Sequence, residues 1–164
     1  MLVKHLILFI FLVSAFQKSK SQSLPTKYEQ YEFLKWYVKQ YDEKGWSDSL
    51  IHFEDEYSKL ADLYAQQIKF SKADVKYFKR QILSNNKFLR LDKEVINNVA
   101  WKKSNDYSKG IWVSMPLFSR NKRIAVINNN TYCGPLCGSY GMEIYIKVKG
   151  KWRQSKYTPP KAES

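Results

Sequence analysis

A stretch of strict alternation near the C-terminus limits most strongly how this chain can fold. Between residues 142 and 149, Met, Ile, Ile and Val alternate with Glu, Tyr, Lys and Lys. Successive side chains of a strand point to opposite faces, so this stretch predicts a strand with one buried face and one solvated polar face. Residues 111–115 are mainly apolar and residues 124–127 wholly so, both are of strand length, and Lys149-Gly150-Lys151 provides a tight turn. Residues 111–153 therefore predict an antiparallel β-meander.

The apolar pattern before this region is helical. Apolar side chains recur at steps of three and four residues in three segments, and a short fourth helix is expected after Asp92. Ser71 and Asp74 resemble a capping box at the start of the third segment. Helices followed by strands predict an α+β fold, with three to four N-terminal helices packed on a C-terminal antiparallel β-meander. The three helical segments are residues 31–41, 50–69 and 71–84.

The first residues have the pattern of a cleavable signal peptide. A short basic start is followed by an apolar run, Leu6 to Val13, and then by small and polar residues. The run is shorter than the about 20 residues that span a bilayer, so we expect no membrane span in the mature chain. Cleavage before Gln22 is preferred over cleavage after Ala15, and the product is exported to the periplasm or the extracellular space. The predicted organisation is a signal peptide over 1–21, one α+β domain over 22–157 and a flexible tail over 158–164.

The chain has two cysteines, Cys133 and Cys137, in a loop rich in glycine and proline. Because paired cysteines close in an oxidising compartment and the loop can bring them within bridging distance, a structural disulfide is favoured. Redox catalysis stays an alternative, although the spacing is one residue longer than Cys-x-x-Cys and leads into a predicted strand rather than a helix. Metal binding is a second alternative, although His52 is the only histidine after the leader that could add a ligand to the two cysteines. We therefore predict neither a metal nor another cofactor.

A family resemblance rests on this loop and its neighbours. The segments Gly110-Ile-Trp-Val-Ser114, Ile124-Ala-Val-Ile127, Cys133-Gly-Pro-Leu-Cys-Gly138 and Lys149-Gly-Lys-Trp152 resemble an uncharacterised family of small exported, mostly bacterial proteins. These carry a C-G-x-x-C-G loop between two strands and a terminal G-K-W strand turn, and Tyr140 departs from their usual G-S-G ending. The resemblance implies an exported α+β protein and implies no particular chemistry.

Positive charge gathers in the second half of the chain. The whole sequence has 28 lysines and arginines against 15 acids, and residues 76–156 hold 17 of these bases but only 4 of the acids. A solvated basic surface that keeps the protein soluble is the simplest interpretation. The alternative is docking to phosphorylated envelope polymer, acidic polysaccharide or anionic lipid, and Tyr145 and Trp152 lie among the bases where they can stack on sugars. The candidate anion-binding residues are Arg120, Lys122, Arg123, Lys147, Lys149, Lys151 and Arg153.

No catalytic motif stands out in the sequence. His52 and Glu56 are four residues apart in a predicted helix and are interpreted as a surface ion pair. The sequence therefore predicts an exported non-catalytic binding or accessory module that contacts an anionic polymer or glycan, and no nucleic acid, because the chain leaves the cytoplasm. The alternative is a hydrolase-type enzyme with its site between helices and sheet. A flat basic face would favour the first and a concave pocket the second, and the oligomeric state is not determined.

Overall fold

The computed structural model describes residues 23–41, 45–53, 70–97, 99–102, 110–134 and 137–156, together with the backbone of 162–163. The predicted signal peptide, most of the predicted helix over 50–69 and most of the predicted tail lie outside these residues. In chain order the elements are α2 (Lys27–Val38), β1 (Trp46–Leu50), α4 (Lys72–Asn85), β2 (Gly110–Val113), β3 (Leu117–Phe118), β4 (Ile124–Gly134), β5 (Cys137–Val148), β6 (Lys151–Gln154) and β7 (Ala162–Glu163).

The predicted fold class is wrong. Within the described residues there are two helices, not three to four, and the strands form one seven-stranded mixed sheet rather than an antiparallel meander. The path through the sheet is β1-β2-β4-β5-β6, and β1 runs parallel to β2. Trp46 and Leu50 pair with Ile111 and Val113, so a strand occupies the break that was expected between the first two helices. Apolar spacing within one segment does not reveal a ladder partner so distant in the sequence.

Both helices begin at capping boxes. Thr26 Oγ1 accepts from the Glu29 amide at 3.2 Å while Glu29 Oε2 accepts from the Thr26 amide at 2.9 Å. The capping box predicted at Ser71 and Asp74 is confirmed, with the same two reciprocal bonds at 3.1 and 3.2 Å. The expected fourth helix is absent from the described residues, because after Asp92 the chain makes only turns.

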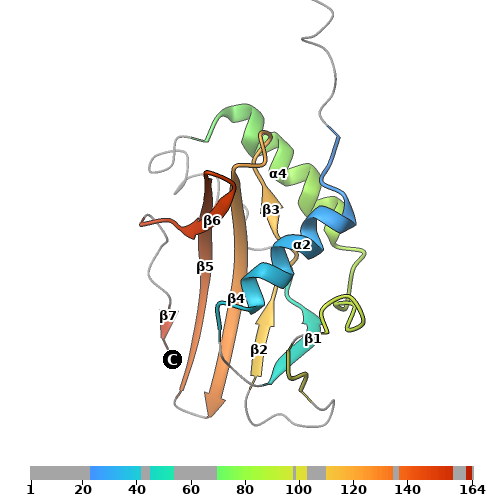
Figure 1. Cartoon of the computed structure of the whole chain (residues 1–164), viewed down its shortest axis with the longest axis vertical. Helices are drawn as coiled ribbons and strands as arrows, with labels where there is room; N and C mark the ends of the chain where they lie inside the picture. The colour runs from blue at the N-terminus through green and yellow to red at the C-terminus, as the bar shows by residue number, and fades with distance from the viewer. Residues whose placement is uncertain are drawn as a thin grey trace, which may run out of the picture.

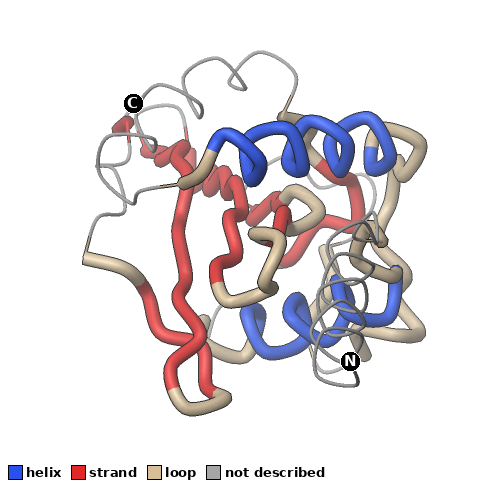
Figure 2. The backbone as a smooth tube through the Cα atoms, turned by 90° about the horizontal axis from the view of Figure 1, so that it is seen from above, coloured by secondary structure: helices blue, strands red, loops and turns tan. Residues whose placement is uncertain are grey.

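The two helices cover opposite faces of the sheet. Residues of α2 pack with Ala125, Ile127 and Tyr145, whereas residues of α4 pack with Val126 and Ile144. Figure 1 shows α2 in front of β4, and Figure 2 shows one helix on each side of the strands. The prediction that one face of β5 is solvated is therefore wrong for the centre of the strand, where α2 covers that face.

The disulfide prediction is confirmed. Cys133 and Cys137 are bonded, with their Cα atoms 5.1 Å apart, where β4 ends and β5 begins. Both sulfurs form this disulfide, so neither cysteine is a free thiol. No described helix has the length and apolar content needed to cross a bilayer.

Candidate binding cleft

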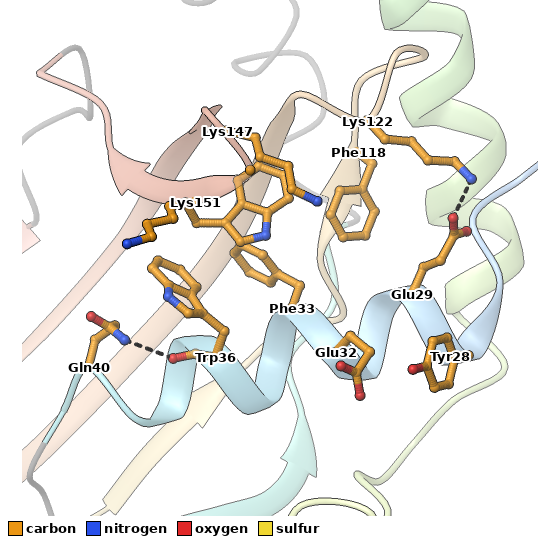
Figure 3. A pocket seen from close by; sticks show the side chains of 12 residues that line it. Tyr28, Glu29, Glu32, Phe33, Trp36, Gln40, Phe118, Lys122, Lys147 and Lys151 are labelled. Carbon is orange, nitrogen blue, oxygen red and sulfur yellow. Dashed lines mark hydrogen bonds and ion pairs between the residues drawn. The ribbon is translucent and has the colours of Figure 1, made fainter.

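A cleft of about 620 Å³ opens between α2 and the turns that follow β3 and β5 (Figure 3). Its lining joins aromatic rings to charged side chains from segments far apart in the sequence. The aromatic residues are Tyr28, Phe33, Trp36, Phe118 and Trp152, and the charged ones are Glu29, Glu32, Lys122, Lys147 and Lys151.

A tight turn places one wall of the cleft. Lys149 and Gly150 have φ values of 50° and 80°, and two successive residues with positive φ match the two-residue turn that the twist of a β-hairpin favours. The turn reverses β5 into β6, so that Trp152 pairs directly with Lys147. Their side chains meet, because Lys147 Nζ lies 5.2 Å from the centroid of the Trp152 ring.

Aromatic contacts hold this hairpin against the helix. Trp152 packs edge-to-face on Phe33 of α2 at a centroid distance of 5.2 Å and lies 6.0 Å from Phe118 of β3. Trp36, one helical turn after Phe33, packs edge-to-face on Tyr145 at 5.2 Å. Trp36 and Trp152 both keep part of their surface exposed. The cleft therefore has a fixed aromatic wall with two indoles within reach of a ligand.

An ion pair between Lys122 and Glu29 closes one end of the cleft (Figure 3). Partial burial acts to raise the pKa of Glu29, but the hydrogen bond and charge of Lys122, with the bonds to Thr26, lower it overall. At the opposite end, Figure 3 shows Lys151 beside Trp36 and Gln40. The charge of Lys122 is thus neutralised within the protein.

The other two lysines of the cleft have no such partner. Among the described residues, no carboxylate lies within ion-pairing distance of Lys147 or Lys151. Glu32 pairs instead with Lys35 on the same helix, at 3.2 Å. Two positive charges therefore lie beside the aromatic wall without a carboxylate partner in the part of the chain that the structure describes.

A buried carboxylate network lies behind the aromatic wall. Glu143 is 1% exposed, and its oxygens accept hydrogen bonds from the hydroxyls of Tyr37, Tyr41 and Tyr145 and from the amide of Asn129, at 2.7 to 3.0 Å. Because Tyr145 packs on Trp36 with its ring and on Glu143 with its hydroxyl, the network fixes the wall from behind.

The tyrosines of this network are held in their protonated form. Burial, assisted by the hydrogen bond to Glu143, raises the pKa of Tyr145 far above its ordinary value. Burial and the Glu143 charge do the same for Tyr37, and burial is the main cause that raises the pKa of Tyr41 to about 12. All three hydroxyls therefore remain donors at neutral pH.

The structure brings together three of the predicted anion-binding residues. Lys122, Lys147 and Lys151 line the cleft, whereas Arg120, Arg123, Lys149 and Arg153 are exposed and are not part of its lining. Trp152, predicted to stack on sugars, lies in the wall, and Tyr145 lies behind it.

Other residues of the site were not predicted from the sequence. Phe33, Trp36 and Gln40 were not predicted as site residues, and Glu143 was placed on a solvated face. One sequence feature points to Glu143: it is the only acid between Asp106 and Glu163, amid many bases.

The remaining candidates do not join the cleft. His52 is exposed and follows β1 in a loop, and Glu56, its predicted partner, lies outside the described residues. No group of three or more His, Cys, Asp or Glu side chains suited to a metal ion occurs in the described residues. Comparisons with protein-family models, with curated proteins and with solved structures find no match to this chain.

Proposed function

We propose that this protein is an exported, non-catalytic binding module whose cleft between α2 and the β5–β6 hairpin binds an anionic ligand of the cell envelope. The observation that carries the proposal is the pair Lys147 and Lys151, which stand unpaired among the described residues beside exposed indole surface. A cleft of this volume is within the range of small-molecule sites, which combine apolar walls with a few placed polar groups. The leader pattern and the disulfide support export.

The concave shape of the site is the feature that was expected to favour the hydrolase alternative over a flat basic face. Glu29 and Glu32 are three residues apart on α2 and both line the cleft, as a pair of catalytic carboxyl groups would. A general acid, however, needs a raised pKa, and the pairing of Glu29 with Lys122 lowers its pKa. Binding without turnover is therefore the function that the cleft supports best.

Salt-dependent retention on an immobilised acidic polysaccharide tests the proposal. We expect the protein to be retained at low salt and released as salt rises, because exposed charge pairs are screened. The double variant Lys147→Met/Lys151→Met should elute at clearly lower salt than the wild type. Lys76→Met/Lys79→Met removes the same charge from the exposed surface of α4 and is the matched control.

The control separates a specific site from net charge. The control variant should elute close to the wild type, because α4 covers the sheet face opposite to α2. If both double variants elute together, total charge alone explains retention and the cleft is not the binding site.

A further inference from the structure

We infer that the ligand of this cleft is a carboxylated saccharide, bound with its carboxylates at Lys147 and Lys151 and its ring faces against the indoles of Trp36 and Trp152. The inference rests on the proposed function and narrows it to one chemical class. The total basic charge of the protein would attract acidic sugars and phosphate polymers alike. The inference is that the cleft prefers the acidic sugars.

The charge of the cleft varies along its length. Lys122 is neutralised by Glu29, and Glu32 adds a second carboxylate to the helix side. A chain with several closely spaced negative charges would meet these carboxylates, and like charges repel at short range. A ligand whose negative charges are spaced apart by sugar rings can meet Lys147 and Lys151 and avoid that repulsion.

The groups that remain suit sugar hydroxyls. Gln40 Nε2 donates to the carbonyl of Trp36 at 3.1 Å, which leaves the side-chain oxygen of Gln40 as an acceptor at the same end as Lys151. Glu32 offers further acceptor oxygens at the rim. Acceptors of this kind favour a ligand that carries O–H donors, and a phosphate polymer at neutral pH offers few of them.

The aromatic wall points the same way. A saccharide ring has an apolar face of C–H groups. Burying this face against an indole removes it from water and stabilises the complex. A phosphate chain has no such face. Among the described residues, the cleft lining also includes no arginine, the side chain that binds phosphate through two parallel hydrogen bonds.

Isothermal titration at constant low salt and pH 7 tests this assignment with four probes. These are trigalacturonate, trimannuronate, the methyl ester of trigalacturonate and inorganic tripolyphosphate. We expect at least one of the two carboxylated trisaccharides to bind about tenfold more tightly than tripolyphosphate. The methyl ester keeps the rings and loses the charge, so it should bind about tenfold more weakly than trigalacturonate if trigalacturonate is the better ligand.

Two variants locate the interaction. Lys147→Met/Lys151→Met should weaken the trisaccharide about tenfold or more, whereas the control Lys76→Met/Lys79→Met should leave it within about twofold. Trp36→Leu should weaken the trisaccharide and leave tripolyphosphate unchanged, because only the sugar uses the indole. Each variant is titrated below its own midpoint of thermal unfolding, so that binding is measured on folded protein.

The outcomes separate this inference from the proposed function. If tripolyphosphate binds as tightly as either trisaccharide and Lys147→Met/Lys151→Met abolishes it, the anion site stands and the saccharide assignment is overturned. If no probe responds to the cleft variants, the proposed function is overturned as well. Release of shorter sugars during the titration would show turnover and favour the hydrolase alternative.

Discussion

The charged groups on the two sides of the aromatic wall differ in burial and in the number of their partners. Behind the wall, the Glu143 carboxylate is 1% exposed and accepts hydrogen bonds from three tyrosines and Asn129. In front of it, Lys147 and Lys151 have aromatic neighbours and no carboxylate among the described residues. A buried charge destabilises the fold unless hydrogen bonds or an ion pair satisfy it. An exposed charge is solvated by water, so it needs no partner within the protein and stays available to a ligand. We therefore expect the first region to determine stability and the second to determine binding.

The strongest test of this contrast is the removal of the buried carboxylate. Glu143→Ala leaves three hydroxyls and an amide without their acceptor and opens a cavity beneath the wall. We expect a loss of about 3–5 kcal/mol in the free energy of unfolding, measured by urea denaturation.

Glu32→Ala, which removes a carboxylate from the exposed surface of α2, is the matched control. It should change the free energy of unfolding by no more than about 0.5 kcal/mol. An equal, small effect of the two substitutions would show that the buried network does not stabilise the fold.

Alkaline pH should weaken the same region selectively. The pKa of Tyr41 is about 12 in the folded protein against 10.0 for an ordinary tyrosine, so the unfolded chain gives up this proton first. The stability that Tyr41 contributes is therefore complete below pH 10 and is lost as the pH rises from 10 towards 12. In Tyr41→Phe this loss is absent, so the difference in unfolding free energy between wild type and variant should narrow over that range.

Denaturation curves at several pH values between 8 and 12 measure this effect. Tyr28→Phe provides the matched control, because Tyr28 is 72% exposed and lies outside the network. Its curve should run parallel to that of the wild type. A Tyr41→Phe curve that also stays parallel would remove Tyr41 from the alkaline response.

Local signals in the sequence explain which features were predicted. The capping box of Ser71 and Asp74, the turn at Lys149-Gly150 and the Cys133–Cys137 disulfide each depend on residues within a few positions of one another. The positions of Lys122 in a turn and of Lys147 and Lys151 beside a hairpin turn could likewise be predicted from the sequence. Their meeting at one cleft was not, because it depends on how two hairpins pack against α2.

The features that were missed depend on contacts distant in the sequence. Alternation correctly separated the two faces of β5, but it does not show what covers each face. A polar residue was assigned to solvent, yet α2 supplies Tyr37 and Tyr41 to satisfy Glu143 inside the protein. The strand β1 was missed for a similar reason, since its parallel partner β2 lies about sixty residues away.

The smallest expected effect on stability comes from Lys147 and Lys151 of the cleft. Lys147→Met/Lys151→Met removes one cation–π contact and no ion pair seen in the described residues. Such a contact at a partly exposed site is worth about 0.5–1 kcal/mol, so the free energy of unfolding should fall by less than about 1 kcal/mol. Urea denaturation beside Lys76→Met/Lys79→Met measures this change. A loss as large as that of Glu143→Ala would mean that these lysines hold the fold together, and the division between a stabilising network and a binding cleft would fail.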